Sequence, residues 1–260
     1  MNMTTIALHS DLHLELQNIP AGWLSSDVPD VLILAGDISY IDRIERFLVE
    51  LTDQHSELQV IYITGNHEYY GSEDMLKAED ALKASLDASD RIHFLQCDTI
   101  ELFNIRFIGC TGWPRMLSLG KEKQQQASKV VGQSINDFYK IGMGYKTFTT
   151  DDCIELGEQH YKWLEQTLAT PTACEQTVVI THFAPSLNVA NPNYPIDEMS
   201  AYFYASFDPL IEKYQPAIWA FGHTHANFDI CMGLTRVISN QHGYGRECKG
   251  SYQTNRVLSL

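Results

Sequence analysis

Residues 60–68 read Val-Ile-Tyr-Ile-Thr-Gly-Asn-His-Glu, an apolar run that ends abruptly in side chains able to bind metal ions. Four other segments have the same form, in which a short strand-like run leads directly to Asp or His. They are Thr5–His13, Val31–Asp37, Thr177–His182 and Ala217–His225. Ligands of open α/β sheets bind outside the carboxyl ends of the strands. We therefore expect the five segments to be strands of one sheet whose ends converge on a single site.

The ends of these segments carry Asp, His and Asn at close spacing. The residues are Asp11 and His13, Asp37, Asn66 and His67, His182, and His223 and His225. Side chains of a strand alternate between its faces, so Asp11 and His13 are expected on one side, as are His223 and His225. Taken alone, Asp11 and His13 are explained as surface residues, 36–37 as a turn, 65–68 as a turn with a helix cap, and His182 as a core or loop histidine. The pair His223 and His225, directly after a buried strand, is rarely only structural. Five of the ten histidines fall at these strand ends, however, and this joint pattern predicts a metal site.

The expected ligands combine carboxylate and amide oxygens with imidazoles and include no thiolate. That mixture suits Zn, Fe or Mn and fits Ca less well. Two such ions roughly 3.5–4 Å apart can hold both the attacking and the leaving oxygen of a displacement at phosphorus. The six cysteines are scattered without a C-x-x-C pair, so we expect reduced thiols and no thiolate zinc site.

The composition is that of a soluble globular protein, with 44% hydrophobic and 20% charged residues among 260. The longest aliphatic run, Val31–Ala35, is far too short to span a bilayer. Because the first strand is expected to begin near Thr4 and to carry ligands by Asp11, we expect no cleaved secretory segment and a cytoplasmic location. The formal net charge of −15 argues against binding of duplex nucleic acid, whose phosphates require an excess of Lys and Arg.

Strand and helix patterns alternate along the chain, which predicts α/β architecture in a single domain over residues 1–260. Helices are expected over 41–51, 72–89 and 151–168 and from Asp208, with Ser72 as the N-cap of the second. Thr149 and Asp152 form a possible capping pair before the third. Residues 112–148 break the rhythm and are expected to be an insertion or flap, and 183–206 a long functional loop. Further strands are expected over 92–95, 99–103, 105–111, 226–231, 234–239 and 255–260.

In their order along the chain, these motifs resemble the calcineurin-like metallophosphoesterase superfamily over nearly the whole sequence, from Asp11 to His225. The resemblance implies a four-layer α/β/β/α sandwich with two mixed central sheets. It implies a metal-bridging hydroxide as nucleophile and His67 as the general acid that protonates the leaving oxygen. It also implies two metal sites that share Asp37, one formed by Asp11, His13, Asp37 and His225 and the other by Asp37, Asn66, His182 and His223.

Three positions distinguish this chain from branches of that superfamily. The protein Ser/Thr phosphatases carry Arg where this chain has Thr64, and an Asp that orients the catalytic His where it has Tyr40. Asp42 is an alternative for the orienting role. Residues 36–40 are similar instead to the purple acid phosphatase motif, in which Tyr binds ferric iron, but that group lacks a His at the position of His13. A protein-phosphatase function is therefore disfavoured, and Tyr40 is an alternative ligand.

Two segments between the motifs bear on the substrate. The insertion carries a net positive charge, although the chain as a whole is acidic. Its basic residues form either a flap over an anionic substrate or a solvated helical face. Its basic residues are Arg115, Lys121, Lys123, Lys129, Lys140 and Lys146. The long loop is aromatic, suited to stacking on a substrate ring, to a dimer contact or to local packing. Its aromatic residues are Tyr194, Tyr202, Phe203, Tyr204 and Phe207. His242, Tyr244 and Arg246 are further candidates for reaching the site.

These observations predict a dinuclear metal hydrolase that acts on small phosphoesters, with diesters favoured over monoesters. A phosphomonoesterase, including a purple-acid-phosphatase-like enzyme with Tyr40 as a ligand, is the alternative enzyme. A third hypothesis is a catalytically silent scaffold that binds proteins through the same fold. Because all seven ligand positions and His67 are present, the scaffold is disfavoured.

Overall fold

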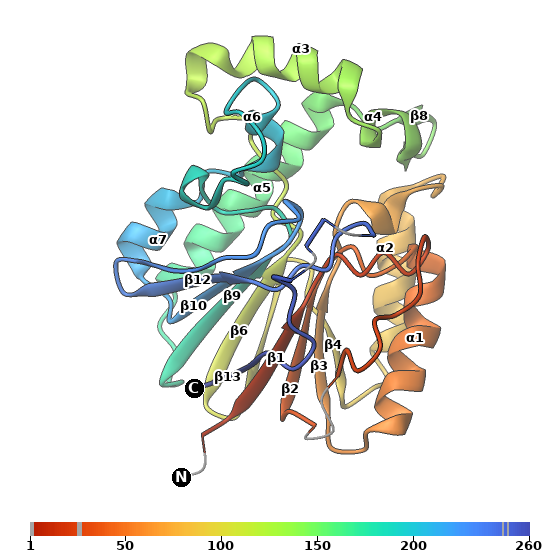
Figure 1. Cartoon of the computed structure of the whole chain (residues 1–260). Coiled ribbons are helices and arrows are strands. Elements are labelled where there is room, and N and C mark those ends of the chain that lie inside the picture. The colour runs from red at the N-terminus through yellow and green to blue at the C-terminus, as the bar shows by residue number, and fades with distance from the viewer. Residues whose placement is uncertain (1–2, 25–27, 246, 249) are drawn as a thin grey trace.

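The computed structural model describes residues 3–24, 28–245, 247–248 and 250–260, and it has a mixed α/β fold with two large sheets (Figure 1). The first sheet has the strand order β13-β1-β2-β3-β4, with β1 Thr5–His9, β2 Val31–Ala35, β3 Gln59–Ile63, β4 Ile92–Phe94 and β13 Val257–Ser259. The second has the order β11-β12-β10-β9-β6-β5, with β5 Asp98–Leu102, β6 Ile105–Cys110, β9 Gln176–Thr181, β10 Ile218–Phe221, β11 Asp229–Met232 and β12 Thr235–Ser239. Within these two sheets, only β5, β11 and β13 run antiparallel to the described strands beside them, so both sheets are mixed, as predicted.

The sheets lie face to face between two layers of helices. Helices α1 (Ile41–Gln54) and α2 (Met75–Leu86) cover the first sheet, and α5 (Thr150–Ala169) and α7 (Asp208–Tyr214) cover the second (Figure 1). This arrangement confirms the predicted four-layer α/β/β/α sandwich.

Burial on both faces explains why the central strands are continuously apolar. Ile33 of β2 packs in the core between the sheets, whereas its neighbours Leu32 and Leu34 pack beneath α1. The period-two alternation of a strand therefore distributes successive aliphatic side chains between two separate cores.

Helix periodicity placed the long helices correctly, but one N-terminus was predicted wrongly. The pair Thr149 and Asp152 forms a capping box at the start of α5, as expected. Helix α2 is capped by Asp74, whose carboxylate accepts a hydrogen bond from the Lys77 amide, and not by Ser72. The Ser72 carbonyl accepts instead from the amide of Gly142, so this residue is part of a contact between distant segments.

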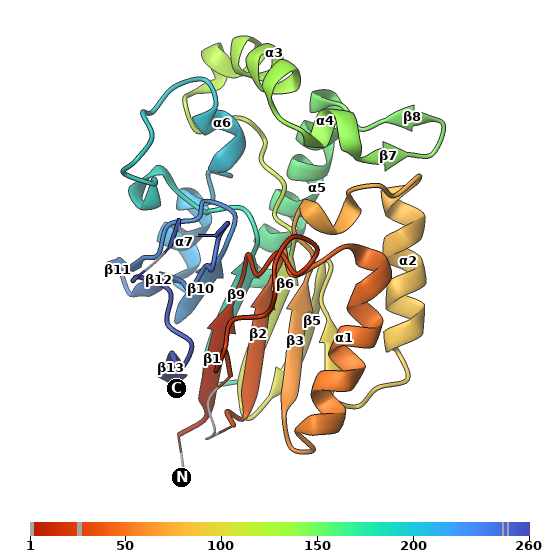
Figure 2. The same ribbon diagram turned by 45° about the vertical axis from the view of Figure 1, so that its right-hand side comes forward.

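Both segments between the motifs contain short elements, which lie above the carboxyl ends of the strands (Figure 2). Residues 112–148 contain the 3-10 helix η2 (Lys121–Lys123), α3 (Gln124–Ser134), α4 (Asp137–Lys140), β7 (Gly142–Met143) and β8 (Lys146–Thr147). Residues 183–206 contain η3 (Leu187–Val189) and α6 (Ser200–Phe203). The two segments are joined by a 2.7 Å hydrogen bond from Gln126 Nε2 to Glu198 Oε1. Within the described residues, no helix combines the length and the apolar character required to cross a membrane.

Candidate metal centre

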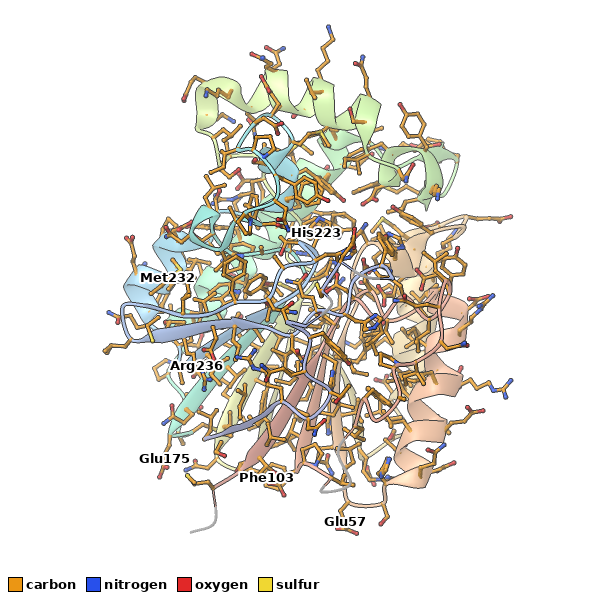
Figure 3. The ribbon with its side chains drawn as sticks, viewed as in Figure 1. Glu57, Phe103, Glu175, His223, Met232 and Arg236 are labelled. Atoms are coloured by element: carbon orange, nitrogen blue, oxygen red, sulfur yellow. The ribbon has the colours of Figure 1, made fainter. Side chains whose placement is uncertain are left out.

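The five motif-bearing strands end close together on one side of the two sheets, but they come from two sheets and not from one as predicted. Strands β1, β2 and β3 belong to the first sheet, and β9 and β10 belong to the second. Because the sheets pack with these strand ends on the same side, the five loops lie together. In Figure 3, His223 lies near the carboxyl ends of the strands, and Glu57, Phe103 and Glu175 lie at the opposite ends.

The candidate ligands lie in turns beyond the strands, so the expected period-two geometry is wrong. Strand β1 ends at His9 and β10 ends at Phe221, before any of the ligands. Five of the seven ligands have positive φ, namely Asp11 (55°), His13 (47°), Asp37 (53°), His223 (73°) and His225 (48°). Such left-handed conformations are uncommon outside glycine and concentrate at functional sites. They also turn His223 and His225 toward different neighbours.

The first group of ligand atoms comes from Asp11, His13 and His225, which lie within 4.8 Å of one another. His225 Nε2 lies 3.4 Å from Asp11 Oδ1 and 3.2 Å from His13 Nε2. Nitrogen ligands bound to one zinc-like ion at 2.0–2.1 Å lie about 3 Å apart. The spacing of the two imidazole nitrogens therefore fits a shared cation.

The second group comes from Asp37, His182 and His223, with Asn66 beside them. His182 Nε2 lies 3.4 Å from Asp37 Oδ1 and 3.2 Å from Asn66 Oδ1. His223 Nε2 is buried and has no hydrogen-bond partner among the described residues. A buried polar atom without a partner is costly, and a cation at this position would satisfy it.

Asp37 lies between the two groups. Its Oδ1 faces His182, and its Oδ2 lies 3.8 Å from His13 Nε2. This is the arrangement that a bridging carboxylate requires. Two glycines make room for it, since a Cβ at Gly65 would lie 2.2 Å from Asp37 Oδ1 and one at Gly36 would lie 2.6 Å from His182 Nδ1.

The buried charges of the two groups shift each other's pKa. Burial opposes ionisation of Asp37, but His182, His67 and His13 together hold its pKa well below the usual value. Burial lowers the pKa of His223 well below its ordinary value, which favours the neutral imidazole that binds metals. Burial also disfavours the charge on His182, but the carboxylates of Asp37 and Asp11 outweigh it and raise the pKa to about 9.

In three of the four histidines, a hydrogen bond at Nδ1 points the imidazole Nε2 atom inward. His182 Nδ1 lies 2.9 Å from the Ala35 carbonyl, and His13 Nδ1 lies 3.1 Å from Glu15 Oε1. The Nδ1 atom of His225 is hydrogen-bonded to Glu247. Such outer partners fix the tautomer and orientation of metal-binding histidines. Glu15 and Glu247 were not identified from the sequence, although Glu15 follows His13 by only two positions.

The side chain of Glu68 connects the loop after β2 to the loop after β3. Its buried carboxylate accepts hydrogen bonds from the amides of Gly65 (2.7 Å), Asp37 (3.0 Å) and Ile38 (2.8 Å). Burial and the charge of Asp37 raise the pKa of Glu68 to about 8. Glu68 belongs to the motif at residues 60–68, but its hydrogen bonds reach a loop 30 residues away in the sequence.

His67 lies beside the two groups and is oriented by Glu15, not by Asp42. Its Nδ1 lies 3.1 Å from Glu15 Oε1, and its Nε2 lies 2.8 Å from the hydroxyl of Tyr244. Burial alone would lower the pKa of His67, but Asp37 and Glu15 raise it above the ordinary value. Asp42 is exposed in the first turn of α1.

Tyr40 lies at the N-cap of α1 and is not among the residues that line the pocket described below. The Arg43 guanidinium lies over its ring, 5.5 Å from the centroid. On the side of the first sheet, the carboxylate of Asp37 faces His13 Nε2.

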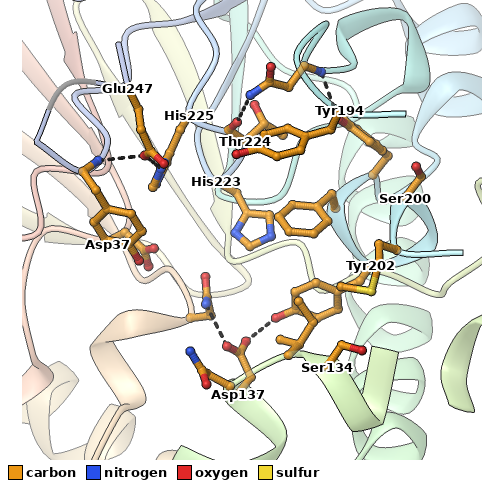
Figure 4. Close-up of a pocket in the computed structure, with 18 of the residues that line it drawn as sticks. Asp37, Ser134, Asp137, Tyr194, Ser200, Tyr202, His223, Thr224, His225 and Glu247 are labelled. Carbon is orange, nitrogen blue, oxygen red and sulfur yellow. Dashed lines mark hydrogen bonds and ion pairs between the residues drawn. The ribbon is translucent and has the colours of Figure 1, made fainter. Parts of the chain in front are cut away.

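A pocket of about 520 Å³ opens from the two groups toward α4 and α6 (Figure 4). Four of the five predicted aromatic residues line it, namely Tyr194, Tyr202, Phe203 and Tyr204. Phe207 packs instead against Trp219, with ring centroids 5.5 Å apart.

None of the six basic residues of the insertion lines this pocket, and its five lysines are exposed, which favours the solvated face over the basic flap. The Arg115 guanidinium lies 3.5 Å from the ring centroid of Tyr161, and Lys146 pairs with Asp152 at 2.6 Å. Of the three C-terminal candidates, Tyr244 lines the pocket, and His242 Nδ1 lies 2.9 Å from Gln17 Nε2. Arg246 lies outside the described residues.

Comparison with known proteins gives consistent matches. The sequence model of the family described as Calcineurin-like phosphoesterase matches residues 4–227. Uncharacterized protein L509 of Acanthamoeba polyphaga mimivirus is 26% identical over 266 residues, covering 92% of this chain and 90% of its own. The structure of a phosphopantetheinyl hydrolase from Mycobacterium tuberculosis is similar with a TM-score of 0.77 at 17% identity, covering 100% of this chain and 96% of its own. That of a dimetal phosphatase from Danio rerio is similar with a TM-score of 0.52 at 15% identity, covering 92% and 87%. These two structures share the fold of this chain.

Proposed function

The chain belongs to the calcineurin-like phosphoesterase family, and from this we propose that it hydrolyses small phosphoesters with the help of two metal ions. One ion would be held by Asp11, His13, Asp37 and His225, and the other by Asp37, Asn66, His182 and His223. The proposal is carried by the buried His223 Nε2, which has no hydrogen-bond partner in the described part of the chain. It lies beside a carboxylate whose two oxygens face two separate ligand groups. Oxygen and imidazole ligands without thiolate suit Mn, Fe or Zn.

Bound in these groups, the ions would activate a water and offset the charge on the phosphoryl oxygens. The protein supplies the proton for the leaving oxygen. His67 is placed for this role, because Glu15 holds its Nδ1 while its Nε2 is directed toward Tyr244 at the pocket wall. The carboxylate of Glu15 also favours the protonated imidazole, the form that a general acid must have before the reaction.

The lining of the pocket favours phosphodiesters over monoesters. Among the described lining residues there is no Lys or Arg, and Asp197 and Glu247 add negative charge. A phosphomonoester carries a charge of about −1.5 to −2 at pH 7, whereas a diester carries one negative charge and an additional organic group. The aromatic and amide side chains of the pocket suit such an uncharged group, which they would hold beside the metal ions.

The printed names of the similar structures suggest specific substrates to test. One is a phosphopantetheinyl hydrolase and the other a dimetal phosphatase, so phosphopantetheinyl esters and simple aryl phosphates are informative first choices. The formal charge of −15 disfavours duplex nucleic acid as a substrate. We further propose that the enzyme works in the cytoplasm without a membrane partner.

Metal analysis followed by parallel ester assays tests this proposal. We expect two metal ions per chain and faster hydrolysis of bis-p-nitrophenyl phosphate than of p-nitrophenyl phosphate, which share one leaving group. Faster monoester turnover across such matched pairs would reverse the ordering and favour the phosphomonoesterase. Unchanged hydrolysis of alkyl esters in both His67→Ala and Asp37→Asn would contradict the catalytic assignment, whereas a metal-loaded wild type that hydrolyses no ester would favour the scaffold hypothesis.

A further inference from the structure

Asp137 is a buried carboxylate of the insertion that belongs to neither ligand group. It begins α4 and is only 1% exposed. Its Oδ1 accepts hydrogen bonds from Asn66 Nδ2 at 3.0 Å and from the Tyr70 hydroxyl at 2.6 Å. Its Oδ2 accepts a hydrogen bond from the Tyr202 hydroxyl (Figure 4). One carboxylate of the insertion is therefore the shared acceptor of three donors around the metal centre.

The contact with Asn66 decides which end of its amide faces the second ligand group. Asn66 Oδ1 lies 3.2 Å from His182 Nε2, and its Nδ2 points to Asp137. Only the oxygen of an amide can bind a cation, and only the nitrogen can donate a hydrogen bond. Because Asp137 Oδ1 accepts the hydrogen bond from Asn66 Nδ2, it holds the amide nitrogen outward and the amide oxygen toward the metal position.

The other two donors contact further residues of the site. The Tyr70 ring stacks on His67, with centroids 4.2 Å apart and planes at 28°. The Tyr202 ring lies edge-on to His223, with centroids 5.5 Å apart. Tyr202 is in α6, so Asp137 also connects the insertion to the long loop across the pocket.

We propose that Asp137 is a positioning residue that orients Asn66 as an oxygen ligand of the second metal ion. Its catalytic relevance rests on the function proposed above, whereas its effect on metal binding is independent of any substrate. The insertion thereby completes the metal centre from outside the strand-end loops.

Calorimetric titration of the metal-free protein with Mn²⁺ tests the assignment without an activity assay. In Asp137→Asn, a single oxygen is left for three donors, so the orientation of Asn66 is no longer unique. Loss of such outer partners weakens metal binding roughly 10- to 100-fold, and we expect this loss for the second Mn²⁺ ion only. The spin-coupled signal of a Mn pair in electron paramagnetic resonance should fall at the same concentrations.

Asp152→Asn is the matched control, because it replaces another largely buried carboxylate that caps α5 and contacts no candidate ligand. It should bind both ions like wild type even though it is less stable. The double variant N66D/D137N exchanges the carboxylate and the amide, so an oxygen again faces the metal position while position 137 donates. We expect it to recover the second ion to within about tenfold of wild type, a recovery that a purely structural role of Asp137 would not produce.

Wild-type affinity for both ions in Asp137→Asn would overturn the assignment, as would a double variant that binds no better than the single one. If Asp137→Asn does not fold, the double variant alone tests the proposal. Binding of one ion instead of two by the double variant would then contradict the proposal. If the wild type binds two ions but hydrolyses no ester, the proposed function fails while the role of Asp137 in metal binding stands.

Discussion

At the scale of single residues, the candidate centre is held by backbone conformations that L-amino acids avoid. Asp11, His13 and Asp37 all have positive φ, at a cost of roughly 1–2 kcal/mol each. Hydrogen bonds between the loops hold these conformations in place, including the one from the Asp11 amide to the Gly36 carbonyl and the one from the His13 amide to the Asp37 carbonyl, both 3.0 Å. These hydrogen bonds therefore hold the candidate ligands in position, despite the strain, before any ion binds.

Gly65 provides a direct test of this close packing. In Gly65→Ala, the new Cβ would lie 2.2 Å from Asp37 Oδ1 and displace the carboxylate shared by both groups. We expect the variant to lose at least one metal ion and its activity to fall by about 100-fold. Changes to residues that only contact a metal ligand already reduce metal affinity or activity by about 10- to 100-fold. Metal content by mass spectrometry checks this.

Gly132→Ala is the control for that variant. Its Cβ would meet only the side chain of Thr150, at 3.1 Å, and alanine is a better helix former than glycine in α3. Two bound ions in Gly65→Ala would show that the carboxylate of Asp37 has more room than the structure gives it.

His67 is expected to matter most for substrates with poor leaving groups. In His67→Ala the leaving oxygen receives no proton, and general acid catalysis typically contributes about 10²–10⁴-fold. We expect a loss in kcat of that order for alkyl esters and a much smaller loss for p-nitrophenyl esters, with two metal ions retained. Rates across a series of leaving groups check this, and an equal loss for every ester would argue against proton donation.

At the scale of secondary structure elements, the long helices follow from sequence patterns and the short ones do not. Ile44, Leu48 and Leu51 show the helical spacing that buries one face of α1, and the Thr149–Asp152 pair marks the start of α5. Helix α4 has only four residues and depends on contacts with distant segments. Local periodicity contains no information about such contacts, which is why 112–148 was predicted only as an insertion.

The capping box of α5 makes stability dependent on pH in a defined direction. Burial would raise the pKa of Asp152, but Lys146 and Thr149 outweigh it and lower the pKa below its ordinary value. A lowered pKa in the folded state stabilises the protein above the unfolded-state pKa, and the contribution disappears as the pH falls through the folded-state pKa. We expect Asp152→Asn to cost about 0.5–2 kcal/mol at pH 7.

Urea unfolding of wild type and Asp152→Asn at a series of pH values measures this contribution. The difference in free energy of unfolding should be constant above pH 5 or so and shrink below about pH 4, where Asp152 becomes protonated. A difference that stays constant down to the acid limit of folding would show that the carboxylate charge does not contribute.

At the scale of the whole molecule, the two candidate ligand groups come together because two sheets present their strand ends on the same side. The sequence motifs identify each loop, and their order along the chain identifies the family. Neither shows that the loops come from different sheets or that Glu15, Glu247 and Asp137 complete the surroundings of the ligands. Those three carboxylates are brought in by tertiary structure, so only the ligands and His67 could be predicted from local sequence.

Metal binding should stabilise the whole fold, because it joins loops from both sheets. An ion present at 100 times its Kd stabilises a protein by about 2.7 kcal/mol per site. We therefore expect EDTA to lower the Tm of metal-loaded wild type and of His67→Ala alike. Asp37→Asn should show a smaller change, since it lacks the shared carboxylate. Equal effects of EDTA on all three proteins would place the stabilising ions elsewhere.

Anomalous diffraction from crystals of the Mn-loaded protein tests the central claim most directly. We predict two anomalous peaks on either side of Asp37, roughly 3.5–4 Å apart. One should lie among Asp11, His13 and His225, and the other among Asn66, His182 and His223. A single peak, or peaks that do not contact Asp37, would contradict a dinuclear centre built from the two ligand groups.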